Sequence, residues 1–448
     1  MKLKPSSFTQ VVTDTRKMIP GALFIAIPGE NFDGHDFIES AISKGVKGVL
    51  CRNDFEIKEH AEVVFFRVDD PVQAFRTLAQ EWRNEFKIPV IAIGGSEGKT
   101  TTKELLAAIL KGKFEKVLKT EGSQNGYLGI AMTLVELHKK HQVAVVEIGI
   151  DEIGAMEKHV RIVNPTHGIL TSIGPEHLEK LKDLQTVARE ETLLLYEILK
   201  KGGTIALDLD NPWLDSLVQE KTGRILGYQM SQKKPNFAFD VIVGHYSGEE
   251  LTVENFESKP LHFKLPLPGI HNAKNLLGAI ALAKTLGLNS NEIRLGLENF
   301  PHPTDRSVIE ILPNKMIFIR DYYNANPTSM EAGLKLLDET ANKLKPPAIK
   351  WACLGDMLEL GAVEEKYHRE VSRMILELKI ENVLLFGERM KSLLDELRKK
   401  KFKGFMKHCA THLEMAKTLK EKLHPEDVVL IKGSHGMKME EVWNLYRA

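Results

Sequence analysis

An apolar run at residues 90–93 leads directly into the glycine-rich sequence GGSEGKTT, residues 94–101. Apolar side chains at helical spacing follow at residues 103–110, and Gly112 marks the expected helix end. A buried strand, a glycine-rich turn and a helix in this order let backbone amides point at phosphate oxygens. The helix N-terminus adds about half a positive charge at the same place. The chain is therefore predicted to bind phosphate at a strand-to-helix turn of an α/β sheet.

The individual loop residues suit a nucleotide with its metal. Lys99 can reach the β- and γ-phosphates, and the Thr100 hydroxyl can bind Mg²⁺. The spacing Gly-x-x-Gly-Lys-Thr is shorter than the usual nucleotide-binding pattern, which would place a glycine at Ile93, so an incidental turn is the alternative. Glu97 is unexpected in such a loop, because a carboxylate repels a triphosphate unless it points outward or meets a metal.

Two more polar residues follow apolar runs that read as strands. Glu147 comes after residues 143–146, and His177 lies shortly after residues 168–171. An acid at the carboxyl end of a parallel strand near a phosphate loop can hold Mg²⁺, although a solvated strand end is an equal alternative. Open α/β sheets bind ligands at this edge, so His177 is a candidate for metal or phosphate, against a purely structural histidine.

The 448 residues predict several domains, with three as the central expectation. Residues 1–87 alternate short apolar runs with turn signals, as in a small α/β unit. Residues 88–302 alternate strands and helices, as in a mostly parallel sheet, with an antiparallel patch between 228 and 268 and a helix at 273–286. Residues 303–448 begin after the proline-rich linker at 301–303 and predict a third, Rossmann-like α/β domain with strands near 316–319, 349–354, 383–386 and 428–431.

The overall charge favours no polyanionic partner. Lysine plus arginine and aspartate plus glutamate both number 61, which argues against nucleic acid or a membrane surface. The three cysteines, Cys51, Cys353 and Cys409, fit neither a disulfide framework nor a zinc cluster, and buried thiols are expected. No signal peptide or membrane span is recognisable, so a cytoplasmic protein is expected.

Motifs along nearly the whole chain resemble those of the Mur ligase family. They are Thr13-Asp14-Thr15-Arg16, the loop at 95–101, Asn125-x-x-x-Gly129, Glu147-Ile-Gly149, His177-Leu-Glu179, Pro268-Gly-Ile-His271-Asn272-x-x-Asn275, Asp321-Tyr-Tyr-Asn324-Ala-Asn326-Pro327, Leu354-Gly-Asp356 and Lys432-Gly-Ser434. Any one of them is a weak signal, whereas the set in this order is specific.

The resemblance implies an ATP-dependent ligase that joins D-alanyl-D-alanine to UDP-N-acetylmuramoyl-tripeptide through an acyl phosphate, in peptidoglycan precursor synthesis. It implies a UDP-precursor-binding N-terminal domain, a central ATP-binding domain and a C-terminal domain for the amino substrate. A monomer with ATP and Mg²⁺ as cofactors is expected.

The family roles carry over onto matching positions of this chain. Catalysis and metal binding fall to Lys99, Thr100, Glu147 and His177, with Mg²⁺ on the last three. ATP binding falls to Gly95, Ser96, Gly98, Lys99, Thr100, Thr101, Asn272, Asn275, Arg306 and Asp321. The residues implied to bind the UDP substrate are Asp14, Thr15, Arg16 and Asn125, and those implied to bind the amino substrate are Asn324 and Asn326.

One position departs from the family pattern. The resemblance implies a carbamylated lysine in the central domain, and the matching stretch is Ala188-Arg189-Glu190-Glu191-Thr192. Arginine stays protonated and does not form a carbamate. The hypothesis is that Glu190 or Glu191 supplies the carboxylate instead, or that one metal suffices.

Three functional classes remain after this comparison. The first is the ligase, and the second is a non-catalytic protein that binds the UDP precursor. The third is a related ligase that adds another amino acid or extends folate, and the motifs at 14–16 and 324–327 disfavour the folate enzyme.

Overall fold

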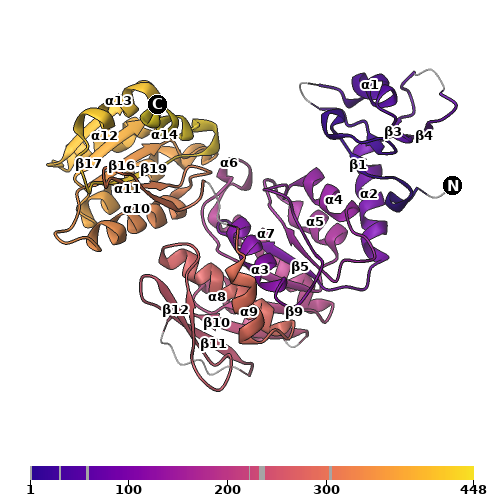
Figure 1. Cartoon of the computed structure of the whole chain (residues 1–448), viewed down its shortest axis with the longest axis horizontal. Helices are drawn as coiled ribbons and strands as arrows, with labels where there is room; N and C mark the ends of the chain where they lie inside the picture. Colours follow the sequence, from indigo (N-terminus) through magenta and orange to yellow (C-terminus); the bar gives the residue numbers. More distant parts are fainter. Residues whose placement is uncertain (1–2, 30–31, 57–59, 221, 232–237, 302–304) are drawn as a thin grey trace.

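The computed structural model describes residues 3–29, 32–56, 60–220, 222–231, 238–301 and 305–448. Within these ranges the strands form three sheets, which follow one another along the chain and are separate bodies in Figure 1. The predicted class, α/β with a mostly parallel central sheet, is confirmed. The predicted linker at 301–303 and the boundary at 302/303 lie outside the described residues, apart from Pro301 itself.

The N-terminal sheet is small and parallel, with strands in chain order. Its elements are β1 (Val11–Val12), β2 (Leu23–Ile25), β3 (Gly48–Arg52), β4 (Val64–Val68) and helix α1 (Ile38–Ser43). Helix α2 (Pro71–Asn84) begins at the side-chain cap of Asp70 and packs against helices of the central sheet. Buried Arg83 fixes it there, since its Nε and Nη2 donate to the carbonyls of Val163 and Asn164, each at 2.9 Å.

The central sheet has the strand order β13-β12-β11-β10-β9-β8-β5-β7-β6. Its strands are β5 (Val90–Gly94), β6 (Val117–Lys119), β7 (Val143–Glu147), β8 (His167–Leu170), β9 (Thr204–Asp208), β10 (Arg224–Gln229), β11 (Val241–Tyr246), β12 (Glu250–Glu254) and β13 (Leu261–Lys264). The chain leaves β5 on one side for β6 and β7 and then crosses to β8, so β5 is the topological switch point, where such sheets bind ligands. The antiparallel patch is confirmed for β11–β13, whereas β10 and β11 are parallel.

Helices cover both faces of this sheet because successive strand residues point to opposite sides. Ile91 and Ile93 pack in one cluster with the first group of helices, whereas Val90 and Ala92 pack in another with the second group. The first group is α3 (Lys99–Leu110), α8 (Ile270–Thr285) and α9 (Ser290–Glu298). The second is α4 (Tyr127–Val135), α5 (Ala155–Val163) and α7 (Leu184–Lys200), and the short α6 (Leu178–Leu181) precedes α7.

The C-terminal sheet has the order β14-β15-β19-β16-β17-β18, in which β14 is antiparallel to β15 and the other neighbouring strands are parallel. Its strands are β14 (Val308–Ile311), β15 (Ile317–Arg320), β16 (Lys350–Gly355), β17 (Asn382–Phe386), β18 (Phe405–Cys409) and β19 (Val428–Lys432). Helices α10 (Pro327–Asn342), α11 (Glu364–Glu377) and α12 (Met390–Lys399) cover one face, and α13 (His412–Lys422) and α14 (Glu440–Arg447) cover the other.

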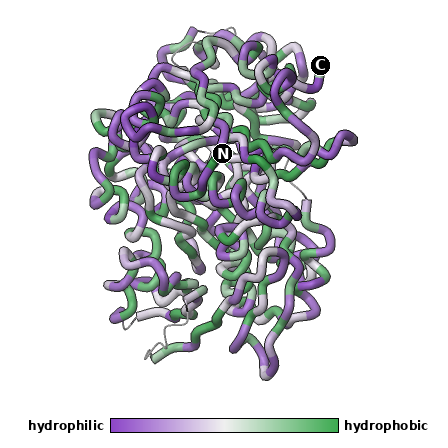
Figure 2. Tube along the Cα trace, turned by 90° about the vertical axis from the view of Figure 1, so that its left-hand side faces the viewer, coloured by the Kyte–Doolittle hydropathy of each residue, from purple (hydrophilic) through white to green (hydrophobic). Residues whose placement is uncertain are grey.

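Apolar and polar residues are distributed as in an ordinary layered protein. All three cysteines are buried free thiols, as predicted. Hydrophilic and hydrophobic residues intermix along the trace (Figure 2), and no helix within the described ranges is long and apolar enough to cross a membrane.

Candidate functional site

The phosphate loop leaves β5 and enters α3 through two glycines with positive φ. Gly95 has φ +115° and Gly98 has φ +77°, a region that L side chains rarely adopt. A Cβ on Gly95 would lie 2.5 Å from the Thr171 hydroxyl, and one on Gly98 would lie 2.6 Å from the Asn275 side-chain oxygen. Both glycines are therefore required by conformation and by close packing, which is the backbone geometry that the sequence predicted.

A neighbouring segment after β8 holds this loop in place. The Ser96 hydroxyl donates to the Gly174 carbonyl at 3.0 Å and accepts from the Gly174 amide at 2.9 Å. The Glu97 amide donates to the Ser172 hydroxyl at 2.8 Å. The loop is thus pre-shaped before any ligand binds.

Lys99 folds back onto the loop that it follows. Its ammonium donates to the carbonyls of Gly95 and Ser96 and lies 3.6 Å from a carboxylate oxygen of Glu176. Burial disfavours the charged form, but Glu176, Glu191 and the other nearby carboxylates outweigh burial and raise the pKa of Lys99. Lys99 is therefore a fully charged group at the place where the sequence predicted a phosphate contact.

Thr100 and Glu147 meet across the carboxyl ends of the strands. The Thr100 hydroxyl donates to Glu147 Oε1 at 2.9 Å, and the Asn125 amide donates to the same oxygen at 2.7 Å. Glu147 is 1% exposed, and its Oε2 has no hydrogen-bond partner among the described residues, although the Lys103 ammonium lies 3.5 Å away. An enclosed carboxylate oxygen beside a hydroxyl is a donor set that suits a hard divalent cation.

His177 is less closely associated with this pair than predicted. It lines the same cavity, but its Nδ1 lies 2.5 Å from Glu359 Oε2, a residue that follows β16 of the C-terminal sheet. Within the described ranges no three His, Cys, Asp or Glu side chains gather as a cation cluster. The structure thus brings together two of the three predicted metal ligands and turns the third toward the C-terminal sheet.

The stretch that departs from the family pattern lies on α7. Arg189 is exposed, and Glu190 accepts from the Gly154 amide at 2.9 Å, away from the phosphate loop. Glu191 is fully buried, and its Oε2 accepts from the Gly95 amide at 2.8 Å. Of the two glutamates, Glu191 is therefore the one whose carboxylate reaches the loop.

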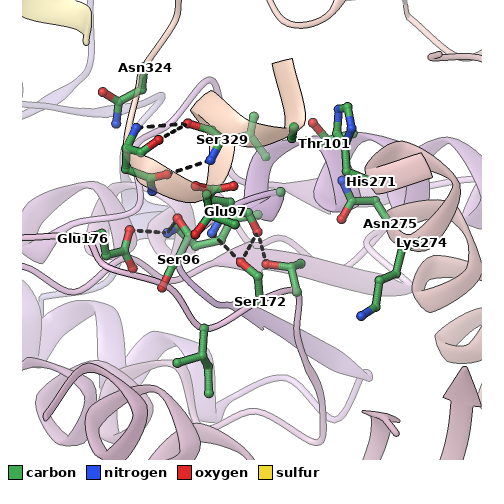
Figure 3. A pocket seen from close by; sticks show the side chains of 18 of the residues that line it. Ser96, Glu97, Thr101, Ser172, Glu176, His271, Lys274, Asn275, Asn324 and Ser329 are labelled. Carbon is green, nitrogen blue, oxygen red and sulfur yellow. Dashed lines mark hydrogen bonds and ion pairs between the residues drawn. The ribbon is translucent and has the colours of Figure 1, made fainter. Parts of the chain in front are cut away.

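The predicted adenine-side residues lie at the start of α8. The Asn272 amide donates to the Pro268 carbonyl at 2.7 Å, and Asn275 packs against Gly98. Nearby, Lys274 pairs with buried Asp208 at the end of β9, with 2.7 Å between Nζ and Oδ2. Figure 3 shows His271, Lys274 and Asn275 together on one side of the pocket.

The C-terminal sheet supplies the opposite wall. Buried Lys432, at the end of β19, pairs with Asp321 after β15 at 2.7 Å and donates to the Asn324 carbonyl at 3.0 Å. Burial raises and Lys432 lowers the pKa of Asp321, and the net shift is downward. Asn326 caps α10 by accepting from the Ser329 amide at 2.9 Å, and the Arg306 guanidinium lies 3.6 Å from the Tyr323 ring centroid.

These walls enclose one cavity of about 630 Å³. Its lining includes the following predicted site residues: Ser96, Gly98, Lys99, Thr100, Thr101, Asn125, Glu147, His177, Asn272, Asn275, Arg306, Asp321, Asn324 and Asn326. Gly95 lies directly behind this lining. Asp14, Thr15 and Arg16 do not line the cavity, and Asp14 and Arg16 instead pair with each other at 2.8 Å in the N-terminal sheet region.

Sequence reasoning missed several groups at the site. Lys103, Glu176, Asp208 and Lys432 were not assigned roles, although Lys432 stands in a motif that was noted. Asp208 carried the same signal as Glu147, an acid at the end of an apolar run, and could have been found. Lys103 lies inside a helix, and only the folded structure shows that it faces Glu147.

Comparison with known proteins identifies the family of this chain. Residues 7–83 match the model described as "Mur ligase family, catalytic domain". Residues 93–283 match "Mur ligase middle domain", and residues 308–435 match "Mur ligase, glutamate ligase domain". The UDP-N-acetylmuramoyl-tripeptide–D-alanyl-D-alanine ligase of Bacillus subtilis (strain 168) is 31% identical over 437 residues, covering 96% of this chain and 92% of the relative. The enzyme of the same name from Escherichia coli (strain K12) is 31% identical over 436 residues, with the same coverage.

Solved structures give the same picture. A crystal structure of MurF from Acinetobacter baumannii has a TM-score of 0.84 at 27% identity, covering 98% of this chain and 94% of that chain. The MurF ligase from Thermotoga maritima in complex with ADP has a TM-score of 0.83 at 23% identity, covering 99% and 98%, and shows the shared fold. The length and identity of these matches show that this chain belongs to the Mur ligase family.

Proposed function

We propose that this protein is an ATP-dependent ligase that adds D-alanyl-D-alanine to UDP-N-acetylmuramoyl-tripeptide in peptidoglycan precursor synthesis. The observation that carries the proposal is the single cavity in which the phosphate loop of the central sheet faces Asp321, Asn324 and Lys432 of the C-terminal sheet. The relatives named for this reaction, with about 92% of their length covered, support the substrate assignment.

In this proposal ATP is held by the loop at 95–101, with its adenine end toward Asn272 and Asn275. The tripeptide carboxylate attacks the γ-phosphate and becomes an acyl phosphate, which the amine of the dipeptide then converts to an amide. Lys99 offsets the charge on the transferred phosphoryl group, since positioning and charge neutralisation dominate this chemistry.

Mg²⁺ fits the pair formed by Thr100 and Glu147. Glu147 Oε2 accepts no hydrogen bond from the described residues, although the Lys103 ammonium lies 3.5 Å away. This oxygen and the adjacent Thr100 hydroxyl are donors of the kind that the ion prefers. When bound there, the ion would neutralise charge on the phosphates. His177 could join these ligands through Nε2 while its Nδ1 stays with Glu359.

The remaining roles complete the proposal. The N-terminal region, residues 1–87, binds the UDP moiety with Asp14, Thr15 and Arg16, and Asn125 contacts the same substrate from the central domain, residues 88–302. Residues 303–448 bind the dipeptide with Asn324 and Asn326. A cytoplasmic location and a monomeric state stay predictions from the sequence.

The test is phosphate release from purified protein with Mg-ATP, UDP-N-acetylmuramoyl-tripeptide and D-alanyl-D-alanine, omitting each in turn. Release that requires all three, with a product heavier by the dipeptide residue mass, is expected. Release with a different amine would keep the mechanism and change the substrate. Binding of the UDP substrate without release would favour the non-catalytic alternative.

A further inference from the structure

Glu97 has a main chain held by hydrogen bonds and a side-chain oxygen, Oε1, that has no hydrogen-bond partner among the described residues. Its amide donates to the Ser172 hydroxyl at 2.8 Å, and its carbonyl accepts from the hydroxyls of Thr171 and, at 3.2 Å, Ser172. The side chain lines the cavity, and in Figure 3 it lies between Ser172 and Ser329. The phosphate loop therefore presents a carboxylate to the wall that the C-terminal sheet supplies.

The surroundings of this carboxylate come from four elements. Burial raises its pKa to about 8, opposed by Lys432 on β19, the Ser329 amide on α10 and Lys99 on α3, and assisted by Glu176 before α6. Its Oε1 is enclosed and has no hydrogen-bond partner among the described residues. A carboxylate with a free lone pair and a pKa close to that of an α-amine has the properties of a general base for that amine.

Each of the other titratable groups around the phosphate loop has a partner on at least one atom. Glu147 accepts from Thr100 and Asn125, and Glu191 accepts from the Gly95 amide behind the loop. Glu176 lies against the Lys99 ammonium. His177 is paired with Glu359. Glu97 and Glu176 each keep one oxygen without a hydrogen-bond partner among the described residues, and both line the cavity. Glu176 lies against the Lys99 ammonium, whereas Glu97 lies beside the Ser329 amide of the C-terminal wall.

We propose that Glu97 is the proton acceptor for the incoming amine, a role that rests on the ligase function proposed above. The substrate ammonium gives one proton to the Glu97 carboxylate and becomes a neutral amine. Its lone pair attacks the acyl carbon, so that a C–N bond forms and the C–O bond to phosphate breaks. Phosphate leaves with that electron pair and takes the second amine proton, and Glu97 returns its proton to solvent after the product departs.

The test compares two nucleophiles in Glu97→Gln. D-Alanyl-D-alanine enters as an ammonium, whereas hydroxylamine is mostly uncharged at neutral pH and needs no base to become nucleophilic. With the dipeptide at pH 7 the variant is expected to lose about 100-fold or more in rate, and the loss shrinks as pH rises above the amine pKa of about 8. Hydroxamate formation stays within about 3-fold of wild type, because general-base assistance is not needed there.

The controls separate this role from a structural one. Glu85→Gln, an exposed glutamate at the end of α2, should leave both rates unchanged. Glu97→Asp should restore part of the dipeptide rate. An unchanged dipeptide rate in Glu97→Gln would overturn the proposal, and so would an equal loss with hydroxylamine, which would place Glu97 in phosphoryl transfer or folding. Wild-type protein that releases phosphate with neither nucleophile would overturn the ligase proposal itself.

Discussion

The buried carboxylate of Glu191 on α7 accepts a hydrogen bond from the backbone amide of Gly95 at 2.8 Å, so the phosphate loop is held from its sheet side. The second oxygen of Glu191 has no hydrogen-bond partner among the described residues. Burial, which outweighs the attraction of Lys99, raises the pKa of Glu191 to about 8. This contact therefore joins the geometry of the loop to a titratable group.

The pH dependence of stability should report on Glu191. Its folded pKa of about 8 lies above the ordinary value of 4.5, so the folded state holds the proton more tightly than the unfolded state. The resulting stabilisation is complete below 4.5 and is lost as pH rises through 8. Glu191→Gln cannot lose a proton, so its urea midpoint should rise relative to wild type between pH 5 and pH 8. A constant difference between the urea midpoints of the variant and the wild type across that pH range would contradict the raised pKa of Glu191.

Two of the glycines that lead helices, Gly98 and Gly154, make a matched pair for testing the loop. Gly98 and Gly154 have φ of +77° and +81°, and each precedes a helix. Alanine at either position should cost about 1 kcal/mol of stability from the left-handed backbone. Only Gly98→Ala also meets Asn275, at 2.6 Å, whereas a Cβ at Gly154 meets nothing within 4 Å. Calorimetric titration with ATP should therefore show weakened binding in Gly98→Ala alone, and equal affinities would refute the packing argument.

Thr100→Val removes the hydroxyl that contacts Glu147 and keeps the side-chain volume. We expect phosphate release to fall by about 10²–10³-fold, as when one electrostatic stabiliser of a transition state is removed. Binding of the UDP substrate should persist, because Thr100 is not one of its proposed contacts and three of them, Asp14, Thr15 and Arg16, lie outside the cavity. Release at the wild-type rate at saturating Mg²⁺ would exclude Thr100 as a metal or phosphate ligand.

Breaking the ion pair of Lys432 and Asp321 should destabilise the C-terminal sheet. Lys432 is 2% exposed, so Asp321→Asn leaves a buried ammonium without its counter-ion and should cost about 3 kcal/mol or more. Trp351 and Trp443 are buried in this region and report its unfolding by fluorescence. Lys315→Ala breaks an exposed pair with Glu426 and should cost less than about 1 kcal/mol. Similar losses in the two variants would contradict the burial argument.

The sequence predicted the parts of the fold that carry strong local signals. The strand–glycine–helix unit at β5 and α3 was anticipated because an apolar run, glycines and helical spacing coincide there. Strands β14 and β18 were missed, since they are edge strands whose side chains are only partly buried and carry little apolar pattern. Strand β9 was missed despite a clear apolar run, so there the sequence held a signal that the prediction did not use.

The site was predictable where its functional residues are adjacent in the sequence, as Lys99 and Thr100 are. It was not predictable where two distant elements meet. The contact of Glu191 with Gly95 spans 96 positions, and its existence depends on how α7 packs on β5. The pairing of His177 with Glu359 likewise depends on how two sheets face each other, which local patterns do not encode.

The packing of α2 on the central domain sets the distance between the N-terminal region and the phosphate loop. Arg83 ties this helix to the turn after α5, and Arg76 stacks on Tyr127 of α4, with its Cζ 3.4 Å from the ring centroid. The small N-terminal sheet is therefore attached to the central one through α2. Under the proposed function, this attachment selects the precursor by its length. A precursor bound at Asp14 and Arg16 reaches the phosphate loop only if the distance from its uridine to its reactive carboxylate matches the distance between these two sites.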